Sequence, residues 1–141
     1  MKRTPTVITG TVGMDVHVIG TKVISRALRD AGFKVVELGM QVSPEEFISV
    51  ARETSADAIL MTSLFGMAEL DLKDFNEKRL EAGLDDVLLY IGGNLVIGRS
   101  DPAEVERKFK ALGFDRVYPP ETDTEVGIAD LKKDLKAKGK M

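Results

Sequence analysis

Short apolar runs alternate along the chain with longer segments in which apolar residues recur every three or four positions. The short runs are rich in β-branched residues and predict buried strands at residues 6–12, 33–38, 56–61, 87–91 and 114–118. The longer segments predict helices at about 20–30, from 44 onward, at about 69–82, at 102–112 and at about 123–137. The fourth strand is almost wholly apolar, as expected where helices cover both faces of a sheet.

This alternation of five strands with five helices predicts an α/β fold: a doubly wound parallel sheet with right-handed crossovers and helices on both faces. At this length we expect the flavodoxin-like (Rossmann-like) strand order 2-1-3-4-5. Because no linker, internal repeat or low-complexity tract divides the chain, we expect a single domain over residues 1–141.

Local signals mark several element boundaries. Ser43-Pro44-Glu45-Glu46 predicts a helix start, because serine caps, proline fits the first helical position and Glu46 completes a capping box. Asp101-Pro102 predicts a second start of the same kind. Gly32 and Gly113 follow predicted helices, where glycine adopts the left-handed conformation that ends a helix. Gly92-Gly93-Asn94 is predicted to interrupt the fourth strand.

Composition narrows the classes of function. The 141 residues are 43% hydrophobic and 30% charged with a net charge of −3, which leaves no basic footprint for nucleic acid or an anionic membrane. The chain has no cysteine, which excludes disulfides, thiolate metal sites and cysteine nucleophiles. The sequence shows neither a signal peptide nor a membrane-spanning run, and we expect a cytoplasmic protein.

Unusual residues follow four of the predicted strands, in segments 14–20, 62–66, 92–98 and 118–122. In a doubly wound sheet the carboxyl ends of the strands share one edge, and ligands bind there. Each segment also has a structural explanation, since a glycine pair could make a turn, Thr62 could satisfy backbone groups and Tyr118 could be a half-buried strand aromatic. Their coincidence at one edge favours a site and leaves the ligand open.

The first of these segments holds the only histidine, His17, two residues after Asp15. An imidazole beside a carboxylate suits a metal ligand, because the carboxylate takes the proton of one ring nitrogen and leaves the other free to bind. A loop histidine without a ligand is the competing interpretation. Other ligands of this fold class can be excluded. A phosphorylatable receiver domain would need an aspartate at the end of strand three, and the sequence has none there. Dinucleotide-binding and P-loop motifs are absent, and a single histidine is too few for a structural zinc site. Thr9 and Thr11 imitate the first loop of a flavin site only weakly.

Three elements together resemble one family. Asp15-Val16-His17-Val18-Ile19-Gly20 matches the Asp-x-His-x-x-Gly motif of cobalamin-binding domains. Thr62-Ser63-Leu64 is similar to the family's Ser/Thr-x-Leu element, and Gly92-Gly93 to its later Gly-Gly element. The three occur in the family's order and at its approximate spacing.

Over nearly its whole length the chain resembles the small cobalamin-binding subunits of mutases that rearrange the carbon skeleton of glutamate. Segments 62–66, 92–98 and 113–120 carry this resemblance. Three departures are visible, since Val16 replaces a common cysteine, Thr62 a common serine and Glu121 an expected glycine. The first removes any role for a thiol, the second keeps the hydroxyl, and the third leaves the far rim of the site less defined.

The resemblance implies that cobalamin binds with its dimethylbenzimidazole tail detached from the cobalt and inserted into the domain. His17 would be the lower axial cobalt ligand, and Asp15 would accept a hydrogen bond from its second ring nitrogen. Thr62 would offer its hydroxyl to the benzimidazole, while Gly20 would leave room for the tail. The implied cofactor-binding set, with no catalytic residue in this chain, is Met14, Asp15, Val16, His17, Val18, Gly20, Thr62, Ser63, Leu64, Gly92, Gly93, Asn94, Leu95, Val96, Ile97 and Gly98.

The activity that the resemblance implies is the isomerisation of L-glutamate to (2S,3S)-3-methylaspartate by a radical that adenosylcobalamin supplies. The substrate would sit in a larger barrel (epsilon) subunit within a heterotetramer, and this chain alone would bind the cofactor without turnover. The alternatives are a corrinoid carrier for methyl transfer, a cobalamin-binding regulatory module and a metal-free flavodoxin-like binding protein. The first usually has an N-terminal helical cap and the second an output domain, and we expect neither here.

Overall fold

The computed structural model of the protein describes residues 4–12, 19–63, 72–93, 102–118 and 122–141. Its strands are β1 (Thr6–Thr11), β2 (Lys34–Glu37), β3 (Ala58–Ser63), β4 (Leu88–Gly93) and β5 (Arg116–Tyr118). Its helices are α1 (Ile19–Asp30), α2 (Pro44–Thr54), α4 (Phe75–Glu81), α5 (Pro102–Ala111) and α6 (Thr124–Ala137). Within these ranges no helix is long and apolar enough to cross a membrane.

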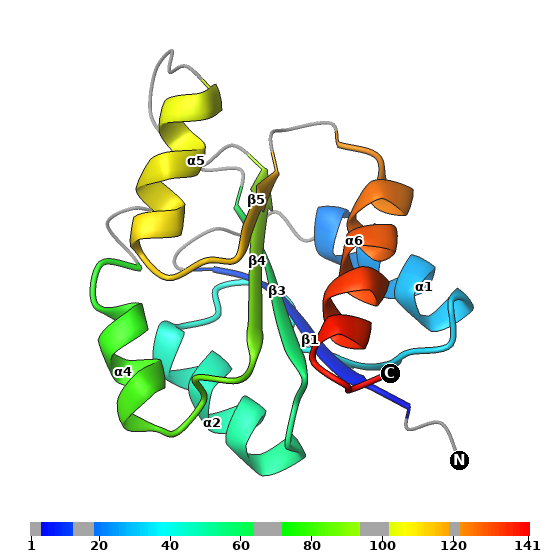
Figure 1. Ribbon diagram of the computed structural model, residues 1–141, viewed down its shortest axis with the longest axis horizontal. Helices are drawn as coiled ribbons and strands as arrows, with labels where there is room; N and C mark the ends of the chain where they lie inside the picture. Colours follow the sequence, from blue (N-terminus) through cyan, green and yellow to red (C-terminus); the bar gives the residue numbers. More distant parts are fainter. Residues whose placement is uncertain (1–3, 13–18, 64–71, 94–101, 119–121) are drawn as a thin grey trace.

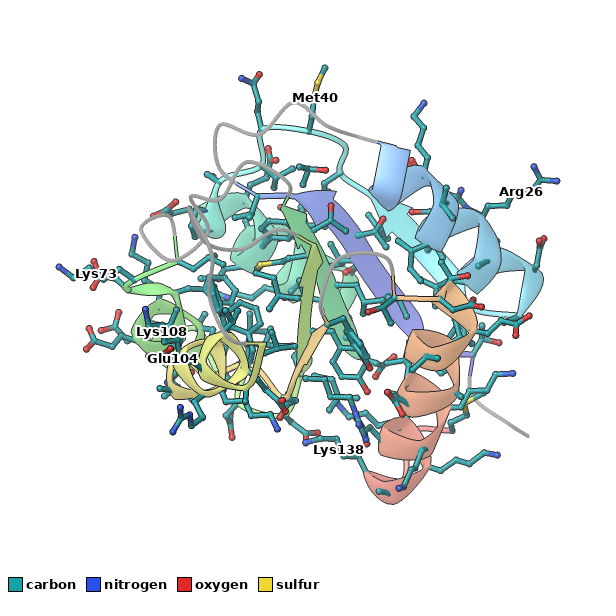
Figure 2. All side chains as sticks on the ribbon, turned by 90° about the horizontal axis from the view of Figure 1, so that it is seen from above. Arg26, Met40, Lys73, Glu104, Lys108 and Lys138 are labelled. Atoms are coloured by element: carbon teal, nitrogen blue, oxygen red, sulfur yellow. The ribbon has the colours of Figure 1, made fainter. Side chains whose placement is uncertain are left out.

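The strands form one parallel sheet in the order β2-β1-β3-β4-β5, which confirms the predicted fold class and strand order. Figure 1 shows three layers, with α1 and α6 on one face of the sheet and α2, α4 and α5 on the other. The view from above in Figure 2 shows the same division. The carboxyl ends of β3, β4 and β5 point to the top of Figure 1, and the C terminus lies at the opposite end.

Apolar side chains form two separate cores, one on each face of the sheet. The core under α2, α4 and α5 is the larger and includes the buried rings of Phe47, Phe75, Phe109 and Phe114. The ring centroids of Phe75 and Phe109 lie 6.1 Å and 6.2 Å from that of Phe114. The buried residues of the core under α1 and α6 are Val7, Leu28, Phe33, Ala58, Leu60, Leu88, Tyr90, Leu131 and Leu135. Because successive strand residues point to opposite faces, the central strands contribute to both cores.

The central strands extend further toward the carboxyl edge than predicted. β3 continues to Ser63, and β4 continues through Gly92 and Gly93. The predicted interruption of the fourth strand is wrong, because Gly92 pairs with Thr62 and Gly93 with Ser63 in the parallel ladder. Helix α4 begins at Phe75, later than the predicted start near residue 69, and residues 69–71 lie outside the described ranges.

Boundary signals act as predicted at α2 and at two helix ends. Ser43 is the N-cap of α2, and its hydroxyl accepts a hydrogen bond from the backbone N–H of Glu46 at 3.1 Å, with Pro44 as the first helical residue. Such a cap satisfies an amide that the helix leaves free and is worth about 1 kcal/mol. Gly32 and Gly113 follow α1 and α5 with φ of +95° and +106°, the left-handed conformation predicted for them.

Two aspartates join neighbouring strands at the amino edge of the sheet. The backbone N–H of Asp57 donates to the carbonyl of Thr6 at 2.8 Å, and the N–H of Thr6 donates to Oδ2 of Asp57 at 2.9 Å. Asp115 and Leu89 exchange the same pair of bonds at 2.8 Å and 2.9 Å. The ammonium of Lys140 lies 4.0 Å from Oδ1 of Asp57 and brings the C-terminal residues to this edge. These carboxylates serve strand pairing.

The substitution Gly10→Ala should destabilise the fold. A Cβ on Gly10 would lie 2.9 Å from Cε1 and Cζ of Phe47, a ring with no exposed surface. Because overpacking a dense core forces side chains and backbone to shift, we expect the free energy of unfolding in urea to fall by about 1–3 kcal/mol.

The matched control for this prediction is Gly127→Ala in α6, where a new Cβ meets nothing within 4 Å. There, alanine should raise the free energy of unfolding by about 0.5–1 kcal/mol, because it favours the helix. Equal effects of the two substitutions would contradict the packing of Phe47 on Gly10.

Candidate functional site

Four residues stand side by side across the carboxyl edge of the sheet. Thr11 of β1 pairs with Thr62 of β3, and Thr62 pairs with Gly92 of β4. Gly92 pairs in turn with Tyr118 of β5. Since neighbouring strands lie about 4.8 Å apart, these residues form a continuous row. We call Thr11, Thr62, Gly92 and Tyr118 the rim row.

The rim row faces α1 and α6. Leu60 and Tyr90 belong to the core on that face, and each lies two residues before a member of the row on its own strand. Residues two apart in a strand share a face, so the row continues this face to the carboxyl edge. The change from Leu60 and Tyr90 to Thr62 and Gly92 replaces large side chains with small ones. The edge therefore offers a surface of small residues near the first turns of α1 and α6.

The two threonines of the rim row are hydrogen-bonded to each other, with 3.2 Å between their Oγ1 atoms. Thr11 has no exposed surface, whereas Thr62 is half-buried. The backbone N–H of Thr11 donates to the carbonyl of Gly39 at 2.7 Å, and its carbonyl accepts from the N–H of Val42 at 2.9 Å. Thr62 thus presents a hydroxyl at the edge beside a fixed hydroxyl partner.

Because residue 92 is glycine, no side chain projects from the middle of the rim row. A Cβ on Gly92 would lie 3.4 Å from Cβ of Tyr118 and 3.6 Å from its carbonyl oxygen. A side chain at this position would cover backbone next to Tyr118. The row therefore has room for a ligand to approach the backbone closely.

A polar network joins the end of the row to α6. The hydroxyl of Tyr118 donates to Oδ2 of Asp130 at 2.7 Å, and its ring lies edge-on to Tyr90 with 5.8 Å between centroids. The hydroxyl of Tyr90 donates to Asp134. The guanidinium of Arg116 also donates to Asp134, from Nε to Oδ2 at 2.8 Å and from Nη2 to Oδ1 at 3.0 Å. Because such paired bonds fix geometry, the network fixes α6 against β4 and β5.

The network also determines protonation. The guanidinium of Arg116 is the main cause that lowers the pKa of the Asp134 carboxyl. Burial, reinforced by hydrogen bonds to Asp134 and Asp130, raises the pKa of Tyr90 and of Tyr118. At neutral pH the carboxylate is therefore charged and both phenols keep their protons. Tyr118 closes the rim row as a neutral, fixed aromatic.

The structure brings two of the predicted cofactor-binding residues, Thr62 and Gly92, into the rim row. Ser63 and Gly93 pair at the ends of β3 and β4, and Gly20 lies in the first turn of α1. The other predicted site residues lie outside the described ranges: Met14, Asp15, Val16, His17, Val18, Leu64, Asn94, Leu95, Val96, Ile97 and Gly98. Among the residues that are described, no group of three or more histidine, aspartate or glutamate side chains could hold a metal ion.

Sequence reasoning placed Tyr118 at the candidate edge but did not assign Thr11, or the network that joins Tyr118 to α6, to the site. A threonine in a buried strand is ordinary, and only the register with Thr62 reveals that the two hydroxyls meet. The network had a usable signal, because Asp130 and Asp134 are four residues apart and so share one face of α6.

The sequence model of the B12 binding domain family matches residues 5–129. Together with the doubly wound sheet and the rim row, this match puts the chain in the class of B12-binding domains. The chain is 58% identical over 128 residues to the glutamate mutase sigma subunit of Carboxydothermus hydrogenoformans. This match covers 91% of this chain and 93% of that protein. It is 51% identical over 130 residues to the glutamate mutase sigma subunit of Clostridium cochlearium, and this match covers 92% of this chain and 95% of that protein. The chain belongs to the family of glutamate mutase sigma subunits.

A solved structure of a cobalamin-binding protein from Desulfitobacterium hafniense DCB-2 has the same fold. Its TM-score is 0.74 at 20% sequence identity, and the match covers 92% of this chain and 58% of that one. The similarity therefore extends over almost all of this chain but only part of the solved protein.

The substitution Asp134→Asn should lower stability in a pH-dependent way. It removes the carboxylate that accepts from Arg116 and Tyr90, and we expect the free energy of unfolding near pH 7 to fall by roughly 1–3 kcal/mol. Because the pKa of Asp134 is lowered, this stabilisation is fully present above the ordinary pKa of 3.8 and is lost as the pH falls through the lowered value.

Urea denaturation at a series of pH values checks this. The difference between wild type and Asp134→Asn should shrink below about pH 4. The control Asp85→Asn, on an exposed side chain outside this network, should not lower the free energy of unfolding near pH 7 by a comparable amount. A constant Asp134→Asn deficit down to about pH 2 would contradict the ion pair as its cause.

Proposed function

We propose that this chain binds adenosylcobalamin at the carboxyl edge of its sheet and acts as the cofactor-binding subunit in the isomerisation of L-glutamate to (2S,3S)-3-methylaspartate. One coincidence carries the proposal: the B12-binding match covers residues 5–129, and the sheet edge inside that range has a row of small and hydroxyl-bearing residues. The 58% identity to a glutamate mutase sigma subunit supports the reaction.

The rim row suits the nucleotide tail of the cofactor. A flat benzimidazole needs a surface of small side chains, and Thr62 and Gly92 supply one next to the ring of Tyr118. Once detached from cobalt, the benzimidazole has a nitrogen that accepts a hydrogen bond, and the hydroxyl of Thr62 is a donor of the required kind. Ser63 and Gly93, which follow Thr62 and Gly92 on their strands, would also contact the cofactor.

We assign His17 as the residue that would bind cobalt and Asp15 as the residue that would orient it. Asp15 and His17 fall in the sequence between the central strand β1 and α1, which begins at Ile19. A carboxylate that accepts the N–H of one ring nitrogen fixes the tautomer in which the other nitrogen binds metal. Gly20 would let the tail pass close to the backbone. The residues assigned to the remaining wall are Met14, Val16, Val18, Leu64, Asn94, Leu95, Val96, Ile97 and Gly98.

When bound, adenosylcobalamin supplies an organic radical by homolysis of its cobalt–carbon bond. The contribution of this chain is to bind and orient. His17 would hold the cobalt, Thr62 would hold the tail, and Asp15 would keep His17 in its metal-binding tautomer. We assign no catalytic residue to the chain.

We propose that a larger barrel (epsilon) subunit binds the substrate and covers the carboxyl edge, in a heterotetramer located in the cytoplasm. Met40 supports a contact at this edge. The backbone bonds of Thr11 to Gly39 and Val42 put the segment of Met40 beside the rim row. The side chain of Met40 is 52% exposed and projects outward in Figure 2. Methionine is enriched in protein interfaces, so it suits a partner surface.

Cobalamin titration followed by the visible spectrum tests the binding proposal. The wild-type protein should convert cobalamin to a form with histidine in place of the benzimidazole. His17→Gly should abolish that change and weaken binding by at least about ten-fold, because the ligand itself is removed. An unchanged wild-type spectrum would favour the metal-free binding protein instead.

Reconstitution with the epsilon subunit, adenosylcobalamin and L-glutamate tests the reaction. The complete mixture should form 3-methylaspartate, and neither subunit alone should do so. His17→Gly should lose most of the activity, whereas Arg26→Ala, on an outward-pointing side chain of α1, should keep it. Full activity of His17→Gly would sink the ligand assignment, and a corrinoid methyl carrier would give no 3-methylaspartate at all.

A further inference from the structure

We infer that Thr11 is a positioning residue for the nucleotide tail: it donates its hydroxyl proton to Thr62 and thereby directs the proton of Thr62 toward the tail. The inference rests on the proposed function and adds a residue outside the Asp-x-His-x-x-Gly, Thr-Ser-Leu and Gly-Gly elements. Thr11 would act on the tail through Thr62 and not by direct contact with cobalt or tail.

The geometry brings together two hydroxyls that are 51 positions apart in the sequence. Their strands pair in register at these residues, their Oγ1 atoms lie 3.2 Å apart, and both side chains face α1 and α6. Thr11 is fully buried, so water does not compete for its side of this bond. The half-buried Thr62 is the member of the pair nearer to solvent or a ligand.

The direction of the hydrogen bond follows from proton counting. A hydroxyl has one proton to donate, and its oxygen accepts through lone pairs. The free benzimidazole nitrogen can only accept, so Thr62 must use its proton on the tail. The oxygen of Thr62 is then the acceptor for Thr11, which leaves Thr11 as the donor of the pair. Hydrogen bonds in such a chain polarise and strengthen one another.

The backbone makes Thr11 a fixed reference for Thr62. Thr11 is bonded to Gly39 and Val42 on one side, at 2.7 Å and 2.9 Å. On the other side the N–H of Val12 donates to the carbonyl of Thr62 at 3.1 Å. A β-branched side chain also has few rotamers, so the Thr11 hydroxyl stays where the backbone puts it. A hydroxyl orientated in advance loses less entropy when the tail binds.

The same strand supplies a matched control. Thr9 lies two residues before Thr11 on the same face, and its Oγ1 lies 2.7 Å from Oγ of Ser25 in α1. Both residues are fully buried. The Thr9–Ser25 bond therefore resembles the Thr11–Thr62 bond in chemistry, although both of its partners are fully buried whereas Thr62 is half-buried, and it lies away from the rim row.

The test measures Kd for two corrinoids by visible titration and the free energy of unfolding in urea. One probe is cobalamin, and the other is cobinamide, which has the corrin and cobalt but lacks the nucleotide tail. Thr11→Val should weaken cobalamin binding about five-fold, the usual value of one hydrogen bond, and leave cobinamide binding unchanged. Thr11→Ser keeps the hydroxyl and should recover most of the cobalamin affinity. The control Thr9→Val/Ser25→Ala removes the other hydroxyl pair. Whether or not it lowers the free energy of unfolding, it should leave the Kd of cobalamin and of cobinamide unchanged.

A double-mutant cycle tests whether Thr11 acts through Thr62. If it does, Thr11→Val/Thr62→Val should lose no more cobalamin affinity than Thr62→Val alone, because the second change removes the group that Thr11 positions. Additive losses would overturn the inference, as would an equal loss for cobalamin and cobinamide or an unchanged Kd in Thr11→Val. Each of these outcomes requires that wild type binds cobalamin. A wild-type protein that binds no cobalamin would instead overturn the proposed function and this inference with it.

Discussion

The register of the parallel sheet is the constraint on which the candidate site depends. Parallel pairing brings the carboxyl ends of the strands to one edge, and the register then decides which side chains meet there. A slip of one residue in β3 would turn Thr62 to the opposite face and end its contact with Thr11. Since helices cover both faces, polarity alone does not prevent such a slip. The fit of residues such as Leu60 and Met61 into two differently shaped cores does.

The two edges of the sheet use polar side chains in different ways. At the amino edge, Asp57 and Asp115 complete the pairing of neighbouring strands and so contribute to stability. At the carboxyl edge, the polar groups orient one another: Thr11 beside Thr62, and Tyr118 through Asp130 on α6. Buried polar networks of this kind fix a single arrangement when their members are satisfied. A binding surface made of small residues gains its definition from such neighbours, because the small side chains themselves supply little shape.

Periodicity and capping were sufficient to predict the parallel sheet and the start of α2 after its cap at Ser43, and the fold class together with the chain length predicted the strand order. The resemblance added Thr62 and Gly92, which the structure brings together. The continuation of β4 through Gly92 and Gly93 was not predictable from local preference, because pairing with β3 overrides the tendency of glycine to end a strand. The role of Thr11 was also hidden, since its partner is distant in sequence and only the three-dimensional register brings the two together. The roles assigned to Asp15 and His17 still rest on their motif, because both lie outside the described residues.

The division of the interior into two cores has a consequence for how the chain can evolve. The sheet separates the larger core, under α2, α4 and α5, from the rim row, whereas the row and its tyrosine network share the face of α1 and α6. Apolar substitutions in the larger core can therefore raise or lower the free energy of unfolding while the ligand surface keeps its shape. The second side has no such freedom, because a packing change there displaces the residues that a cofactor would meet. Stabilising substitutions in the larger core can thus compensate for destabilising ones on the face that carries the rim row.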